Sequence, residues 1–211
     1  MATIRSYIFI DQLQPKTMCY LGSFIRGFLP RTNMAALVIE VAPGLDIESI
    51  TDIAVKNVDV KPGILVVERQ FGYLEFHSRS TASVRAAGSA ILEALNASEG
   101  DALRPEILAS KVVKRIDDYH AFLVNRNKIG SMVLAGESLF VLECQPAAYA
   151  ILAANEAEKA AHINILDVRA FGSFGRVYLG GEERDIMAGY GAAVAAIEGV
   201  SGREATTGRR D

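Results

Sequence analysis

The sequence predicts an α/β fold, an α+β sandwich in which helices cover a sheet, and it predicts that fold twice. Short apolar runs typical of strands alternate with amphipathic helices in both halves of the 211-residue chain. Half of the residues are hydrophobic, which is enough for a packed core in each half. Identical residues recur 103 positions apart. A repeat of this length is a whole domain, so we expect two sibling domains.

The elements of the first half follow from periodicity and turn residues. Four apolar runs predict strands at residues 4–10, 35–41, 63–69 and 73–77. Apolar residues at helical spacing predict two helices, at residues 46–57 and 81–95. Asp46 is placed to cap the first of these helices. Each half therefore mixes strands with two helices.

The second half starts again after a polar linker at residues 96–105, which contains Gly and Pro. Gly130, Glu143, Pro146 and Lys159 each lie 103 residues after an identical residue, and the last helices align near 102. The tail lacks large apolar residues, so we expect it to be disordered. The predicted parts are a first domain at residues 1–103, a second domain at 104–204 and the tail at 205–211.

One loop motif occurs in both halves. Residues 66–77 read VVERQFGYLEFH and residues 166–181 read LDVRAFGSFGRVYLGG. Each has an apolar run, then Arg-x-Phe-Gly, then a second apolar run, which predicts two strands joined by a tight loop with Gly at the bend. The motifs match at a spacing of 100, as if three residues were lost before the second loop, and Glu68 of the first faces Val168 of the second. We expect this repeated loop to be the working part of the molecule.

Composition and charge exclude several classes of function. The 22 basic and 25 acidic side chains give a net charge of −3, which offers no case for nucleic-acid binding. No apolar run is long enough for a membrane span, and Asp11 argues against a signal peptide. Cys19 and Cys144 stand in apolar contexts, so we expect buried free thiols in a reducing cytosol rather than a disulfide.

Motifs of catalysis and of metal or cofactor binding are missing. The sequence has no phosphate-binding Gly-rich loop and no dinucleotide fingerprint. His77, His120 and His162 are scattered, so we expect each at the surface or at a sheet edge rather than as a metal ligand. No residue stands in a recognisable nucleophile motif, although spacing alone does not exclude a triad assembled in space. We therefore expect no catalytic residues, no cofactor and no metal, and a protein that is not an enzyme.

Residues 146–186 closely resemble the shell proteins of bacterial microcompartments. The helix with Lys159, the following strand, the Phe-Gly-x-Phe-Gly-Arg loop and the Gly-Gly-Glu-Glu turn appear in family order. The first half resembles the same domain more loosely, and the resemblance extends over residues 4–204. It implies two fused, circularly permuted shell domains of ferredoxin-like fold, of the class that forms trimers. Three such chains make a hexagonal tile, a pseudohexamer, with a central pore.

The resemblance also places functional residues. The two loops would meet at the pore, and an adjacent Glu-Arg pair governs open and closed pores in relatives of this type, which Glu68 and Arg69 match. From the residues alone, the alternative is an ordinary strand-end ion pair. Guanidinium groups around an axis would favour phosphorylated anions. The expected pore residues are Glu68, Arg69, Gln70, Phe71, Gly72, Arg169, Ala170, Phe171, Gly172 and Ser173.

Two lysines and two aromatic residues carry further expectations. The family places a Lys at the tile edge where Lys56 and Lys159 stand, against the plain alternative of solvent-facing lysines. Phe71 and Phe171 either pack under the loops or line the pore, and we favour packing. Neither loop contains Cys, so the resemblance gives no support to the iron–sulfur cluster that some tandem shell proteins hold at the pore.

Three functions remain open at this point. The first is a β-carboxysome shell protein whose gated pore passes ribulose bisphosphate and 3-phosphoglycerate, in a cytoplasmic organelle. Its partners would be its own trimers, two of them stacked face to face, and hexameric and pentameric shell proteins, with no nucleic acid and no membrane. The second is a tile of a catabolic microcompartment that handles aldehydes. The third is a soluble oligomeric sensor or enzyme that binds a small metabolite.

Overall fold

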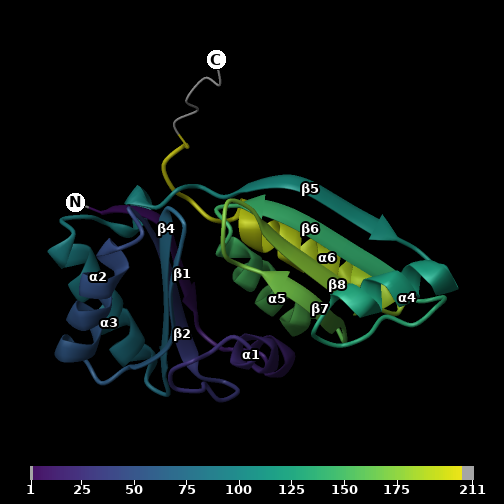
Figure 1. The fold of residues 1–211 in the computed structure, drawn as a ribbon, viewed down its shortest axis with the longest axis horizontal. Coiled ribbons are helices and arrows are strands. Elements are labelled where there is room, and N and C mark those ends of the chain that lie inside the picture. Colours follow the sequence, from purple (N-terminus) through teal and green to yellow (C-terminus); the bar gives the residue numbers. More distant parts are fainter. Residues whose placement is uncertain (1, 206–211) are drawn as a thin grey trace.

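The computed structural model describes residues 2–205 and has two domains of the same architecture (Figure 1). Each domain contains one four-stranded antiparallel sheet, in the order β1-β2-β4-β3 and then β5-β6-β8-β7. The predicted fold class is therefore confirmed. Residues 206–211 of the expected disordered tail lie outside the described part of the chain.

The first domain runs from β1 to α3. Its strands and helices are β1 (Thr3–Ile10), α1 (Pro15–Gly22), β2 (Ala35–Ala42), α2 (Asp46–Asn57), β3 (Lys61–Glu68), β4 (Phe71–Ser78) and α3 (Thr81–Ala94). A short 3₁₀ turn, Glu99–Asp101, lies in the predicted linker. The second domain contains β5 (Glu106–Val113), α4 (Asp118–Asn127), β6 (Ser138–Gln145), α5 (Tyr149–Ala160), β7 (Asn164–Arg169), β8 (Gly175–Gly181) and α6 (Glu183–Glu198).

Two details of the prediction are wrong. Each domain has three helices rather than two, because α1 and α4 were not predicted. Both helices are short, and their buried faces depend on contacts with distant sheets. Asp46 does not cap α2: the cap position is Leu45, without a side-chain hydrogen bond, and Asp46 lies in the first turn.

The two sheets differ in what covers them. In the first domain, α2 and α3 pack on one face of the sheet, and α1 together with the second domain packs on the other face (Figure 1). In the second domain, α5 and α6 cover one face, whereas the opposite face carries only a small cluster with α4. The first sheet is therefore buried on both faces, and the second sheet keeps one face largely open.

Candidate functional site

The two hairpin loops occupy equivalent positions in the two sheets, but in a different register from the one that the motif suggests. Glu40 pairs with Tyr73 in the first sheet, and Glu143 pairs with Arg176 in the second. Lys61 likewise pairs with His77, and Asn164 with Gly180. The spacing of 103 residues therefore continues through both hairpins without any loss of three residues.

The Phe-Gly pairs that correspond in space are Phe71-Gly72 and Phe174-Gly175. A Cβ added at Gly72 would lie 2.2 Å from the carbonyl oxygen of Gly44, and one added at Gly175 would lie 2.2 Å from that of Ala147. Both glycines are strand residues that allow close approach of another backbone, not the bend itself. The proposed alignment of the two Arg-x-Phe-Gly motifs at 100 residues is therefore wrong. The second half contains Phe-Gly twice, and only the backbone contact distinguishes the two copies.

The bend of the first loop is at Arg69. This residue has φ 55°, in the left-handed region that Arg seldom adopts. Its structural counterpart in the second loop is Gly172, with φ 104°. Glu68 therefore corresponds to Phe171, and Gln70 to the exposed Ser173. A left-handed residue at the same point of both loops supports the 103-residue register independently of strand pairing.

The first loop projects into solvent. The side chains of Arg69 and Glu68 are 89% and 49% exposed, and Arg69 Nε lies 3.8 Å from Glu68 Oε1. Gln70 is also exposed. Phe71 is half-buried, with the guanidinium carbon of Arg5 3.8 Å from its ring centre. The pair of charges that we expect at the pore is thus exposed, whereas the aromatic residue packs, as predicted.

The second loop is fastened to the first domain. The Tyr73 hydroxyl accepts a hydrogen bond from Gly172 N (2.8 Å) and donates one to Gly172 O (3.0 Å). The ring of Phe171 packs edge-on against Tyr73, with centroids 5.0 Å apart, and against Phe24. Ala170 is buried. The packing predicted for Phe171 is confirmed, and this loop contacts the strand that follows the first loop.

Arg169 ends β7 rather than lying in a loop. Its Nε donates to Asp167 Oδ2 at 3.1 Å, while half of its side chain remains exposed. The buried Asp167 also accepts a hydrogen bond from the Tyr20 hydroxyl of α1 and lies 3.3 Å from Lys128 Nζ. Sequence reasoning missed Asp167, because its partners are far away in the chain and share no local motif.

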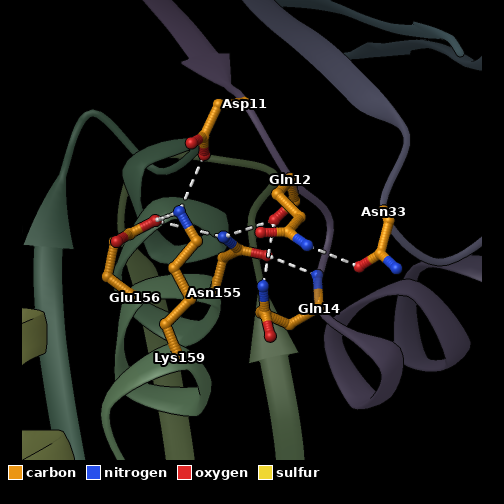
Figure 2. A network of polar contacts seen from close by, with 7 residues as sticks. All are labelled: Asp11, Gln12, Gln14, Asn33, Asn155, Glu156 and Lys159. Atoms are coloured by element: carbon orange, nitrogen blue, oxygen red, sulfur yellow. Dashed lines mark hydrogen bonds and ion pairs between the residues drawn. The ribbon is translucent and has the colours of Figure 1, made fainter.

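A polar network joins the end of β1 and the start of α1 to α5 of the second domain (Figure 2). Asn155 accepts a hydrogen bond from Gln14 N at 2.9 Å and donates one to Gln12 O at 3.2 Å. Glu158 accepts from the backbone N–H groups of Lys16 and Thr17, both at 2.7 Å. A carboxylate of the second domain thereby caps the N-terminus of α1, which has no side-chain cap of its own.

The two lysines expected at the tile edge differ in their surroundings. Lys159 Nζ lies 2.7 Å from Asp11 and 3.0 Å from Glu156, and its side chain is 28% exposed (Figure 2). The hydrogen bond from Lys159 lowers the pKa of Asp11. Lys56 is 71% exposed and pairs with Asp52, four residues earlier on α2. Lys159 thus also links the two domains, whereas Lys56 stands on an open face.

A second carboxylate crosses between the domains. Glu40 is fully buried, lies 2.5 Å from Arg5 Nε and accepts a hydrogen bond from Ala148 N, at the start of α5. Burial raises the pKa of Glu40, and the hydrogen bond from Arg5 opposes that rise. The counterpart of Glu40 is Glu143, which pairs with Arg176 and has no partner domain in this chain.

Two further predictions need correction. His77 is 1% exposed and lies beside Glu75 on the central strand β4, not at the surface or at an edge. Cys144 is buried, as expected, but Cys19 is exposed, and both are free thiols. The buried position of Cys144 raises its pKa to about 12.

Among residues 2–205, no group of three or more His, Cys, Asp or Glu residues is arranged to hold a metal ion. No helix in this range is both long and apolar enough to cross a bilayer.

Comparisons with known proteins place the chain in a family. The model of the CsoS1D N-terminal domain matches residues 4–101. Carboxysome shell protein CcmP of Synechococcus elongatus is 53% identical over 95% of this chain and 94% of its own length. Carboxysome shell protein CsoS1D of Prochlorococcus marinus is 41% identical over 94% of this chain and 78% of its own.

Two solved structures share both fold and sequence with the chain. The fused permuted hexameric shell protein MSM0275 from the RMM microcompartment is 61% identical to this chain, with a TM-score of 0.91. The match covers 94% of this chain and 99% of MSM0275. The double-ringed trimeric shell protein MSM0271 from the same microcompartment is 40% identical, with a TM-score of 0.94, over 97% of this chain and 100% of its own. The chain therefore belongs to the tandem-domain shell proteins of bacterial microcompartments, the family that includes the carboxysome shell proteins CcmP and CsoS1D.

Proposed function

We propose that this protein is a structural, non-enzymatic component of the β-carboxysome shell, and that it forms a pseudohexameric homotrimer with a gated central pore. The observation that carries the proposal is the fastening of the second loop to Tyr73 of the first domain. One chain thereby supplies two adjacent sixths of a ring with their loops on the same side. Three chains complete the ring, with loops of the two kinds in alternation around its axis.

The gate is assigned to the first loop. Glu68 and Arg69 are exposed and contact each other only at 3.8 Å, so an alternative position of either side chain costs little. The second loop has neither charge at the equivalent positions. Three Glu-Arg pairs therefore control the pore, and Gln70, Phe71, Gly72, Ala170 and Ser173 shape its rim.

The permeants are phosphorylated metabolites such as ribulose bisphosphate and 3-phosphoglycerate. Arg69 presents a guanidinium group that suits the geometry of phosphate oxygens. Arg169 is half exposed beside the second loop and adds positive charge near the same axis. Two trimers stack face to face, as the description of the double-ringed relative MSM0271 suggests, and the tiles meet hexameric and pentameric shell proteins, with Lys56 and Lys159 at their edges.

A second candidate is a tile of a non-carboxysome microcompartment. The relative from the RMM microcompartment is 61% identical to this chain, more than the 53% of the carboxysome protein CcmP. The assembly would be the same, and the permeant would be different. Genes for Rubisco and carbonic anhydrase beside the gene of this protein would support the carboxysome, and genes for aldehyde dehydrogenase would support the alternative. Membership in a shell family argues against the third possibility, a soluble metabolite-binding protein.

Replacement of both gate residues tests the proposal. The double variant Glu68→Ala/Arg69→Ala should remain trimeric, because both side chains are exposed, but the ratio of open to closed pores in cryo-electron micrographs should change. The control is Gln70→Ala, which removes a neighbouring exposed side chain without removing charge. An unchanged ratio in the double variant, or loops that lie remote from the three-fold axis, would contradict the gate.

A further inference from the structure

The residues that form the contact between the two domains have counterparts at a spacing of 103 residues, and these counterparts form no such contact within this chain. In the covered contact, α1 and the outer face of the first sheet meet α5 and the second loop. The residues 103 positions away form two open surfaces. One consists of α4 and the outer face of the second sheet, which correspond to α1 and the outer face of the first sheet. The other consists of α2 and the first loop, which correspond to α5 and the second loop. Both open surfaces carry exposed apolar side chains: Tyr119 (82%), Phe122 (57%) and Leu123 (57%) on one, and Leu45 (74%) and Val55 (40%) on the other.

Some polar residues of the covered contact have apolar counterparts, whereas others stay polar: Asn155 corresponds to Asp52 and Lys159 to Lys56. Tyr20 donates to the buried Asp167, and their counterparts are Leu123 and Ile64. Ile64 is buried within the chain, but Leu123 of α4 and Val55 of α2 are exposed, and these apolar side chains indicate that the open surfaces pack against each other. Because they lie on one chain but do not touch within it, the partner is a second copy, bound head to tail.

The helix caps change in the same coordinated way. Glu158 caps α1 from the other domain, whereas its counterpart Val55 carries no charge. The helix that Val55 would meet, α4, is capped within its own segment, because Asp117 accepts a hydrogen bond from Tyr119 N at 2.9 Å. Each of the two helices therefore has a side-chain acceptor for backbone N–H groups of its first turn.

Near the two loops, the residues that correspond to an aromatic pair of the covered contact carry opposite charges. Phe171 packs on Tyr73 within the chain. The counterparts of these two residues are Glu68 and Arg176. Arg176 is held at Nε by Glu143 and remains 41% exposed, and Glu68 is 49% exposed. Opposite charges thus stand where the covered contact has two rings in contact.

We propose that, in the assembled trimer, Arg176 of one chain binds the Glu68 carboxylate of the next chain and positions the gate loop. This inference rests on the proposed trimer. Glu143 orients the guanidinium group of Arg176 by its bond to Nε, which leaves the terminal nitrogens for Glu68. Glu68 then has two alternative partners, Arg69 of its own chain and Arg176 of its neighbour. When Glu68 binds Arg176, Arg69 is released toward the pore.

A cysteine pair tests this contact in the full-length protein. In a Cys19→Ser background, with the buried Cys144 retained, the variant Glu68→Cys/Arg176→Cys should form covalent trimers on mild oxidation or with a short bis-maleimide. Cross-linked species of two and three chains would appear on denaturing gels without reductant. The matched control is Glu68→Cys/Arg184→Cys, since Arg184 is 93% exposed on α6 but lies outside the repeated contact. That control should give no cross-linked trimers.

The outcomes separate the inference from the proposed function. Trimers in solution without cross-linking through residues 68 and 176 would overturn the Arg176 contact and leave the trimer intact. Absence of trimers in the unaltered protein would overturn both. A charge exchange gives a second readout, the ratio of open to closed pores in cryo-electron micrographs. Arg176→Glu should shift this ratio by about tenfold. The double variant Glu68→Arg/Arg176→Glu should restore it. A ratio that does not respond to Arg176→Glu would contradict the inference.

Discussion

The outer faces of the two sheets are formed by corresponding residues, but one face is covered within the chain and the other is open. The first face is covered by the second domain, through a hydrogen-bonded network that includes Asn155, Glu158 and Asp167. The corresponding face of the second sheet is open, with Phe122 and Leu123 of α4 exposed and the side chain of Arg176 41% exposed. A fused chain can use polar contacts inside itself, because the two sides are always together. A contact that must form between separate chains depends more on burial of apolar surface.

The two loops differ in the same sense. The second loop is uncharged and is fixed by the Tyr73 hydroxyl and the Phe171 ring. The first loop is charged, and its exposed side chains Glu68 and Arg69 make a weak contact with each other. In the proposed trimer, each chain would contribute one fastened loop and one exposed loop, so that loops of the two kinds would alternate around the axis.

The largest effect should come from a charge on the open face. Leu123→Asp would bury a carboxylate in the apolar contact between chains, and we expect loss of trimers at micromolar concentration, a weakening of at least 100-fold or about 3 kcal/mol. Light scattering after size exclusion would measure the mass. Met187→Asp is the control, because Met187 is 43% exposed on α6, away from the repeated contact. Unchanged trimers of Leu123→Asp would show that α4 does not join the chains.

Substitutions at the cap of α1 can give the covered contact the residues of the open one. Glu158→Val makes the covered contact resemble the open one and removes the cap of α1, so stability should fall by about 1–3 kcal/mol in chemical denaturation. Adding Gln14→Asp, which imitates Asp117 of α4, should recover about 1 kcal/mol. The reciprocal control Val55→Glu should not stabilise the protein, because α4 already has a cap. No recovery with Gln14→Asp would mean that Glu158 acts by some role other than capping.

A smaller effect is expected at the fastened loop. Tyr73→Phe keeps the ring that Phe171 contacts and removes both hydrogen bonds to Gly172, so we expect a loss of about 1 kcal/mol. Hydrogen exchange at Gly172 N should become faster. Tyr190→Phe is the control, since Tyr190 packs on Phe140 through its ring. Equal behaviour of the two variants would show that the hydroxyl of Tyr73 does not hold the loop.

The sequence was sufficient for most of the fold. Apolar periodicity and turn residues located the four strands of the first half, and the 103-residue recurrence extended the same pattern to the second half. The short helices α1 and α4 were missed, because eight to ten residues give little periodicity and their burial comes from other elements.

The candidate site was predictable only in part. The loops were found, but two Phe-Gly pairs in the second half made the motif ambiguous, and the wrong pair was matched. The correct register depends on the close approach of Gly72 and Gly175 to other backbones, which no local pattern encodes. The contacts of Asp167 and Glu158 join residues 141 to 147 positions apart, so they too are visible only in the folded chain.

The most direct test is a structure of the assembled protein at side-chain resolution. We expect three chains around one axis, with the loops at Arg69 and Gly172 in alternation and Arg176 of each chain beside Glu68 of the next. A structure in which the two kinds of loop lie away from a common axis would contradict this arrangement.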